Sequence, residues 1–151
     1  MKFHPTRYYA GLSNTQKAKR FREIRKFGAL DSNDPKAYVG FKTDRGVKTK
    51  TSSYVKTLKK RFASMGIQGT QTLKQKAKIS GVPHKFLQES YDRGLAAWRT
   101  GHRPGATGPQ WGYARVASRL VCGKTHYGPD ADLVRKAKSQ SRSARRWWKD
   151  C

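Results

Sequence analysis

Hydrophobic side chains recur along this sequence at helical spacing, and the first clear example is a run rich in Lys and Arg near the N-terminus. Phe21, Ile24 and Phe27 follow one another at intervals of three residues. Ser13 stands before the run and Gly28 stands after it. A capping residue, a stretch without Gly or Pro and a Gly stop are typical of an α-helix. The pattern predicts a helix with one narrow apolar edge and basic faces on its other sides.

Further helices are predicted wherever such a run lies between a capping residue and a Gly or Pro. The predicted ranges are 54–65, 72–79, 83–99 and 110–121, with a last helix that runs from Pro129 through Trp148. Residues 100–109 hold three Gly and two Pro, which excludes regular structure between the third and fourth of these helices. Two helices joined by a stiff loop form a helical hairpin.

The helices and the segments between them predict a mainly α protein. Residues 31–51 are rich in turn formers and show no hydrophobic period, which predicts an extended linker. We therefore expect a small helical bundle with a C-terminal helical hairpin, preceded by basic helices and an extended linker. The expected divisions are a basic helical or extended region over 1–79, a helical hairpin core over 80–128 and a basic C-terminal helix over 129–151. Hydrophobic residues make up 35% of the chain, against roughly 45–50% in globular domains, so the core is expected to be small.

Charge indicates what such a protein binds. The chain has 34 Lys and Arg against 9 Asp and Glu, a net charge of +25 on 151 residues. A compact chain with this charge repels itself, and the repulsion is relieved when phosphates replace its counterions. Nucleic acid is the preferred partner, as double-stranded DNA bound largely without regard to sequence. RNA and an anionic membrane surface stay open as alternative polyanions, because charge alone does not separate them.

Basic side chains on successive helical turns are the predicted contact residues, because each can meet a phosphate. A solvated charged face has the same pattern, but so few acids are interspersed here that binding is preferred. The predicted nucleic-acid-binding residues are Lys17, Lys19, Arg20, Arg22, Arg25, Lys26, Lys56, Lys59, Lys60, Arg61, Arg99, Arg103, Arg142, Arg145 and Arg146.

The sequence shows no convincing catalytic or metal-binding pattern. His102 has no carboxylate or cysteine at useful sequence spacing. The Gly-Lys-Thr at 123–125 lacks the upstream Gly of a phosphate-binding loop and is more simply a helix C-cap. Glu89 and Asp92 lie three residues apart, but neighbours such as Arg93 are near enough to neutralise them. We expect no enzyme, no catalytic residue, no metal and no cofactor.

The loop that contains His102 has two interpretations. Gly101 and Gly105 would let backbone N–H groups approach an anion beside Arg99 and Arg103. A loop made rigid so that two helices cross correctly explains the same residues, and this structural interpretation is preferred.

The remaining aromatic residues and the cysteines have structural interpretations. Tyr8-Tyr9 and Trp147-Trp148 offer rings on which bases can stack, but burial in the core or in a protein interface is preferred.

Cys122 and Cys151 do not make a disulfide framework or complete a zinc site, and we expect reduced thiols. Since no run approaches the roughly 18–20 apolar residues of a membrane span, we expect no transmembrane segment, and we expect no signal peptide at the start.

Several stretches of the sequence resemble a known family. The most specific reads YDRGLAAWRTGHRPGAT at 91–107 and is followed by QWGYARV at 110–116. The other stretches are RYYAGLS at 7–13, DPKAY at 34–38 and KTKTSSY at 48–54. Together they resemble an uncharacterised family of small basic proteins of large double-stranded DNA viruses, including algal viruses and tailed phages of aquatic bacteria. The resemblance spans roughly residues 7–134 and implies a viral origin, without an activity, a cofactor or catalytic residues.

Charge, helices and resemblance together favour a virion-associated structural protein. As a minor capsid or internal particle protein, it would bind nucleic acid or another polyanionic surface through its basic surfaces and contact capsid or other virion proteins through its aromatic hairpin. The expected location is the virion, and the cytoplasm or nucleus of the host cell during infection. Three alternatives stay open: a viral nucleic-acid-binding regulatory or nucleoid protein, an accessory subunit of a nucleic-acid enzyme, and a ribosomal-protein-like RNA binder.

Overall fold

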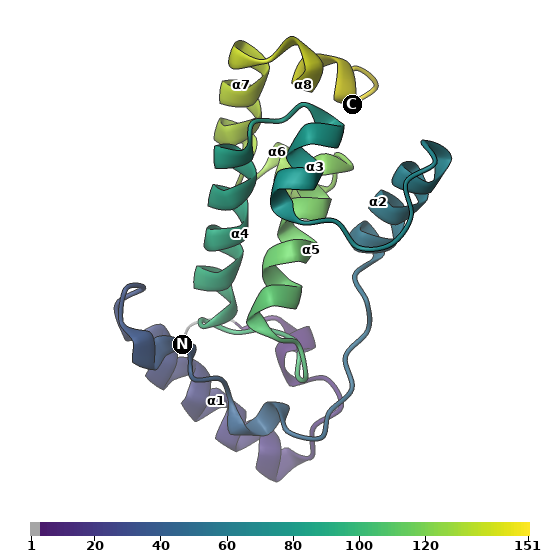
Figure 1. Cartoon of the computed structure of the whole chain (residues 1–151). Coiled ribbons are helices and arrows are strands. Elements are labelled where there is room, and N and C mark those ends of the chain that lie inside the picture. The colour runs from purple at the N-terminus through teal and green to yellow at the C-terminus, as the bar shows by residue number, and fades with distance from the viewer. Residues whose placement is uncertain (1–3) are drawn as a thin grey trace. The chain divides into compact units, whose positions relative to one another are not determined.

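The computed structural model describes residues 4–151, which form helices and no β-strand (Figure 1). The mainly α fold predicted from the sequence is therefore confirmed. The chain folds into two compact units, each made of two separate stretches of sequence. Unit 1 comprises the residues up to Lys50 together with Gly94–Trp111, and unit 2 comprises Thr51–Arg93 together with Gly112–Cys151. No helix among the described residues is long and apolar enough to cross a membrane.

Unit 1 is built around one long basic helix. Its elements are the 3-10 helix η1 (Thr6–Tyr9), α1 (Asn14–Gly28), the 3-10 helices η2 (Pro35–Tyr38) and η3 (Lys42–Asp44), the last turn of α4 (His84–Trp98) and the first turn of α5 (Gly108–Leu120). The helix α1 begins as predicted, because the Ser13 hydroxyl accepts a hydrogen bond from the Gln16 N–H. Ile24, Phe27 and Phe41 form the buried centre of the unit.

The segment 31–51 is more ordered than the extended linker that the sequence predicts. It contains no α-helix, but η2 and η3 lie within it and both contact α1. Ala37, Phe41 and Thr43 are buried. The ring of Phe41 stacks between Phe27, 5.3 Å away, and Trp98, 6.1 Å away. Sequence periodicity misses this segment because single side chains, and not a repeating face, hold it in place.

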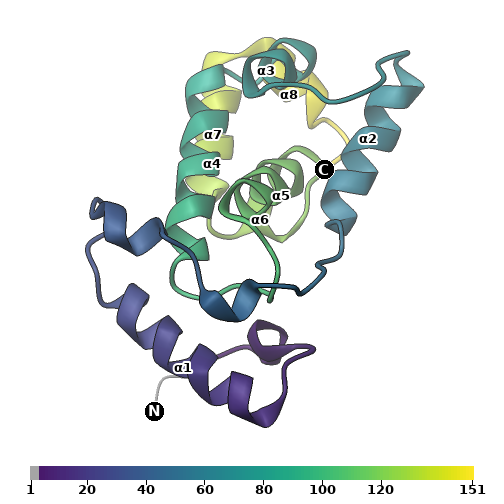
Figure 2. The same ribbon diagram turned by 60° about the horizontal axis from the view of Figure 1, so that its bottom comes forward.

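Unit 2 is a helical bundle centred on α4 and α5. Its other elements are α2 (Ser53–Ser64), α3 (Leu73–Ser80), α6 (Lys124–Tyr127), α7 (Ala131–Gln140) and α8 (Arg142–Trp147). Within unit 2, α4 and α5 lie side by side (Figures 1 and 2), as the predicted hairpin requires. Gly112 makes this packing close, because a Cβ at that position would come within 2.7 Å of the Tyr91 ring. The Arg119 guanidinium then donates hydrogen bonds to the Phe86 carbonyl and the Ser90 hydroxyl, at 2.7 and 2.8 Å.

The caps of α3 follow the sequence signals closely. Thr72 and Gln75 form a capping box, in which each side chain accepts a hydrogen bond from the other residue's backbone N–H. Gly81 ends the helix in the left-handed conformation, with φ at 78°. In contrast, Gly123 is not the C-cap of α5: it begins α6, and Cys122 takes the positive φ of 61° instead.

The predicted C-terminal helix over 129–151 is two helices. Ser141 breaks it with extended backbone, φ −139° and ψ 117°, and its hydroxyl accepts a hydrogen bond from the Ala144 N–H at the start of α8. The same hydroxyl donates to the Gly81 carbonyl at 2.7 Å. Trp147 and Trp148 are both buried in the core of unit 2, which is one of the two locations predicted for them.

Cys122 and Cys151 form a disulfide, which corrects the prediction of reduced thiols. Their Cα atoms lie 6.0 Å apart although 29 positions separate them in sequence. The two positions meet because α7 and α8 bring the chain back to the end of α5, where the Trp147 indole N–H donates to the Leu120 carbonyl at 2.9 Å. Sequence spacing gives no sign of this return.

Candidate nucleic-acid interface

The acidic side chains of unit 1 are engaged inside the unit. The Glu23 carboxylate accepts hydrogen bonds from the Lys42 N–H at 2.7 Å and from the Thr43 hydroxyl at 2.6 Å. Asp31 and Asp34 accept from backbone N–H groups two residues further on. These carboxylates hold turns together and do not pair with the surrounding Lys and Arg side chains.

Three acids of unit 2, Glu89, Asp130 and Asp132, form a second internal network around Arg93. Asp130 is fully buried and accepts hydrogen bonds from Ser90 at 2.6 Å, Arg93 at 3.2 Å and Arg115 at 2.9 Å. Burial alone would raise the pKa of Asp130, but the hydrogen bonds from Arg115 and Ser90, with the nearby charges of Arg115 and Arg119, outweigh it and lower the pKa below its usual range. Arg93 also pairs with Glu89, so the predicted neutralisation on α4 is confirmed for Glu89, whereas Asp92 accepts a hydrogen bond from the Gln88 amide. Arg119 is fully buried, and burial lowers its pKa to about 10.

Because most carboxylates are engaged in these internal contacts, most Lys and Arg side chains have no acidic partner. Among residues 4–151, the only Lys and Arg side chains in ion pairs are Arg20, Arg93 and Arg115. The chain has 34 Lys and Arg in all. The net positive charge therefore lies mainly on side chains that are free to meet an external anion.

The exposed faces of α1 carry the densest group of predicted contact residues. Five of them are exposed on this one helix: Lys17, Lys19, Arg22, Arg25 and Lys26. Arg25 and Lys26 rest their cationic groups 5.8 and 5.4 Å from the ring centres of Phe21 and Phe27. The structure thus brings these five predicted residues together, which we call the α1 cations.

Arg20, the sixth predicted residue on α1, has a different place. It is fully buried in line with Ile24 and Phe27, so it cannot meet a phosphate in this structure. Its guanidinium donates to the Asp44 carboxylate at 2.5 Å, to the Thr43 hydroxyl at 3.0 Å and to the His102 carbonyl. Positions 20, 24 and 27 lie on one helix face. Because Arg20 is charged, the sequence pattern assigns it to the exposed faces and not to this buried one.

His102 also departs from its prediction, because a carboxylate does lie beside it. Its Nε2 is 2.7 Å from the Asp44 carboxylate and its Nδ1 is 2.7 Å from the Trp98 carbonyl. Burial alone would raise the pKa of Asp44, but hydrogen bonds from His102 and Arg20 outweigh it and lower the pKa below its usual range. Because the side chains of Arg20 and His102 are fully buried, this cluster stabilises the unit and offers no open reaction centre.

Arg99 and Arg103 lie in the loop for which an anion pocket was considered. The Arg99 guanidinium donates to the carbonyls of Phe27 and Leu30 at 3.1 and 2.8 Å, so it caps the end of α1. Arg103 is half-buried. Gly101 packs against the Tyr8 ring, where a Cβ would come within 2.6 Å. These contacts support the structural interpretation of the loop.

The predicted residues of unit 2 form two smaller groups. Lys56, Lys59 and Lys60 are exposed on α2, whereas Arg61 lies 3.3 Å from the centre of the Trp147 ring and donates to the Trp147 carbonyl. Arg142, Arg145 and Arg146 are exposed on α8, and Arg145 donates to the Lys138 carbonyl.

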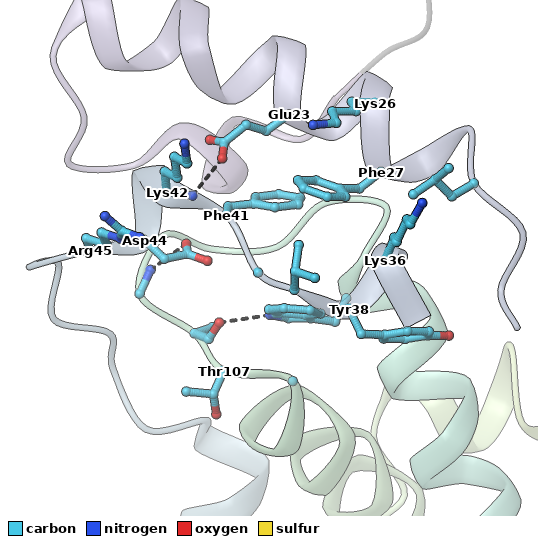
Figure 3. Close-up of a pocket in the computed structure, with 17 residues that line it drawn as sticks. Glu23, Lys26, Phe27, Lys36, Tyr38, Phe41, Lys42, Asp44, Arg45 and Thr107 are labelled. Atoms are coloured by element: carbon cyan, nitrogen blue, oxygen red, sulfur yellow. Dashed lines mark hydrogen bonds between the residues drawn. The ribbon is translucent and has the colours of Figure 1, made fainter. Parts of the chain in front are cut away.

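A groove of about 1020 Å³ opens in unit 1 beside Lys26, one of the α1 cations (Figure 3). Phe27, Phe41 and Trp98 form its apolar wall, and the Trp98 indole N–H donates to the Ala106 carbonyl at 2.8 Å. Val39 lines the groove with 71% of its surface exposed. Four exposed cations border the groove: Lys26, Lys36, Lys42 and Arg45. Lys26 therefore belongs both to the α1 cations and to this border.

Three of these border cations were missed by the sequence analysis. Lys36, Lys42 and Arg45 stand in the segment that was predicted to be a linker. Tyr38 lies between Lys36 and Lys42, and an aromatic residue among basic ones is a sign of single-strand binding that the sequence does offer. Helical periodicity could not find them, because this segment has none.

Comparisons with known proteins place the chain but give it no activity. Residues 5–135 match a family described as "Family of unknown function (DUF5824)". No curated protein and no solved structure shows a significant match. The match covers all of α1, the groove and the α4–α5 hairpin, and it ends within α7.

Proposed function

The chain belongs to this family of unknown function, and we propose that it binds nucleic acid, chiefly through the α1 cations. The observation that carries the proposal is the pattern of ion pairs. The α1 cations are exposed and have no ion-pair partner within residues 4–151, whereas every acid among these residues except the exposed Asp150 is engaged internally. A phosphate backbone supplies the anions that these cations lack, and released counterions drive the binding.

Binding of this kind is largely independent of base sequence. Lys and Arg side chains that end in solvent meet phosphate oxygens, and such contacts position a protein on nucleic acid without reading bases. Five such side chains on one helix can each meet a phosphate of a nucleic-acid backbone that passes α1. Double-stranded DNA is the preferred ligand on this surface, with RNA as the alternative.

The groove adds a preference for unpaired segments of nucleic acid. The exposed Val39 and the half-buried Tyr38 offer apolar contact to a base, and the border cations suit the flanking phosphates. A base within a duplex is stacked and cannot enter, so only a flexible or single-stranded segment can use the groove.

The preferred setting of this activity is a virus particle. The resemblance to small basic proteins of large double-stranded DNA viruses supports that setting, and a high net charge suits a protein that lies against a packaged genome. Mass spectrometry of purified particles tests this part. Many copies per particle support a structural component, and absence from the particle favours a regulatory protein.

Two variants of equal charge test the nucleic-acid interface. In the first, the five α1 cations are replaced by Gln: K17Q, K19Q, R22Q, R25Q and K26Q. In the second, five exposed cations outside the predicted set are replaced: K74Q, K78Q, K124Q, R135Q and K136Q. Both variants carry a net charge of +20, since five charges are removed from +25.

Fluorescence anisotropy with a DNA duplex is measured between about 50 and about 200 mM salt. If the α1 cations contact phosphates, the slope of log affinity against log salt becomes shallower by up to about 4.5 in the first variant and changes far less in the second. Equal losses would mean that total charge, and not α1, determines binding. A shallow salt slope together with strong sequence preference in the unaltered chain would refute the proposal.

The groove has a separate prediction. Val39→Glu places a carboxylate among the border cations, and the exposure of Val39 makes the change compatible with folding. We expect weaker binding of single-stranded DNA with little change for a duplex. Met65→Glu is the matched control, because Met65 is a 51% exposed hydrophobic residue of unit 2 outside the groove. Equal losses for both ligands would remove the groove from the interface.

A further inference from the structure

Cys122, His126 and Cys151 form a cluster in unit 2 that the proposed function does not use. The donor atoms of the three side chains lie within 4.8 Å of one another. His126 is buried, Cys122 is half-buried and Cys151 is exposed. One residue follows α5, one lies in α6 and one follows α8, so the tertiary fold brings them together.

The backbone around Cys122 is held in an unusual conformation. Cys122 is the one non-glycine residue with positive φ, 61°, among residues 4–151. This conformation is costly for a side chain with a Cβ, and such outliers concentrate at functional sites. The next residue, Gly123, packs so closely that a Cβ would come within 2.5 Å of the Tyr54 ring and 2.7 Å of the Ser118 hydroxyl. The chain is therefore fixed where it presents the Cys122 side chain.

His126 is oriented in the way that metal-binding histidines are. Its Nδ1 lies 3.0 Å from the Arg119 carbonyl, which fixes the proton on Nδ1. Nε2 then keeps its lone pair, and it has no hydrogen-bond partner within the described part of the chain. The Trp148 ring meets the imidazole edge-on, with centroids 5.1 Å apart, and restricts its rotation.

We propose that, when its two cysteines are reduced, this cluster binds one thiophilic divalent cation of the Zn²⁺ class. Two thiolate sulfurs and one imidazole nitrogen are typical ligands of Zn²⁺. The fourth position is taken by water, because Cys151 leaves that side of the cluster open to solvent. Each thiol loses its proton to the buffer as its sulfur binds the metal. The metal-bound and disulfide forms exclude each other, because both use the same two sulfurs.

The test uses the full chain without nucleic acid, so its outcome is independent of the proposed function. A water-soluble phosphine first reduces the disulfide: the two sulfurs gain hydrogen, and the phosphine takes up the oxygen of a water molecule. After removal of the phosphine without air, the protein is titrated with Co²⁺ as a spectroscopic probe. We expect one equivalent to produce the d–d bands of tetrahedral cobalt and a sulfur-to-cobalt charge-transfer band, and one equivalent of Zn²⁺ to abolish both.

Three variants show whether the cluster is the site. Cys151→Ser and His126→Asn each remove a ligand, and each should weaken Co²⁺ binding at least about 10-fold. His84→Asn is the control, since His84 lies in the same unit on α4, outside the cluster. Circular dichroism checks that each variant is folded. Cys151→Ser alters an exposed side chain, so it leaves the packing of the core unchanged.

Alkylation provides a measurement that does not depend on cobalt. Zn²⁺ should slow the modification of both cysteines by iodoacetamide in the reduced chain, as counted by mass spectrometry, and His126→Asn should reduce that protection. The proposal is overturned if cobalt stays octahedral. It is equally overturned if Cys151→Ser and His126→Asn bind as the unaltered chain does, because the ion would then sit elsewhere on the surface.

Discussion

Arg20 shows at the scale of a single residue how a cation in a basic helix can be structural. Its side chain is fully buried and its guanidinium is shared among Asp44, Thr43 and the His102 carbonyl. The centre of the guanidinium also lies 4.7 Å from the centre of the Phe41 ring. A buried charge is tolerated only when partners of this kind surround it. The folded state therefore needs the ion pair with Asp44 to compensate the buried charge of Arg20.

Asp44→Asn should therefore destabilise the protein strongly at neutral pH. It leaves the buried Arg20 charge uncompensated, which typically costs about 3–5 kcal/mol of unfolding free energy. Urea unfolding at pH 7 measures the loss. Asp31→Asn is the matched control, because Asp31 is exposed and holds only a local turn through the Asn33 N–H. A loss no larger than that of the control would show that Asp44 does not hold Arg20.

The same pair predicts how stability depends on pH. The pKa of Asp44 is lowered in the folded state. The stabilisation of the folded state by ionised Asp44 is therefore complete above the pKa of Asp44 in the unfolded chain, about 3.9. It is lost as the pH falls from that value through the lower pKa of the folded state. The stability difference between the unaltered chain and Asp44→Asn should narrow below about pH 4. Urea unfolding from pH 7 down to acid checks this, and a difference that stays constant would contradict it.

Residues of this kind mark the limit of what the sequence predicts. The exposed α1 cations were identified because a charged face on a helix follows from spacing alone. Arg20 and His102 were misplaced because their partners are distant in sequence: 24 positions separate Arg20 from Asp44, and 58 separate Asp44 from His102. For the same reason, the disulfide and the contribution of His126 to its cluster could not be predicted.

At the scale of elements, the ends of the helices were the most predictable feature. The capping hydrogen bonds of Ser13, Thr72 and Gly81 are made with residues at most four positions away. Their roles can therefore be predicted from the local sequence. The break at Ser141 was not predictable, because the extended conformation there is held by a hydrogen bond to Gly81 in another part of the fold. The order in segment 31–51 was missed for the same physical reason, since Phe41 depends on Trp98.

Gly81 and Gly66 allow the contribution of tertiary packing at a helix end to be measured. Both have left-handed φ, 78° and 79°, so Ala should cost each about 1 kcal/mol through backbone strain. A Cβ at Gly66 meets nothing within 4 Å, whereas a Cβ at Gly81 would overlap the side chain and backbone of Ser143. Thermal or urea unfolding should therefore show that Gly81→Ala lowers the free energy of unfolding by about 1–3 kcal/mol more than Gly66→Ala does. Equal decreases would mean that α8 can shift away from the new Cβ without a loss of stability.

At the scale of the whole molecule, charge should make salt act in opposite directions on folding and on binding. The folded chain concentrates a net charge of +25, which opposes compactness. Screening this repulsion should raise the melting temperature between about 20 and about 300 mM NaCl. Affinity for DNA should fall over the same range, because counterion release becomes less favourable. Differential scanning calorimetry and anisotropy on one preparation test both, and a melting temperature that falls with salt would contradict the first expectation.

The division of unit 1 into two stretches has a consequence for how the chain is synthesised. Residues up to Lys50 leave the ribosome before Gly94–Trp111, and the intervening Thr51–Arg93 takes about 2–9 s at about 5–20 residues per second. During that interval Arg20 has Asp44 but no His102 carbonyl, and Phe41 has Phe27 but no Trp98. Residues 4–50 can therefore complete their packing only after the end of α4 and its following loop have been made.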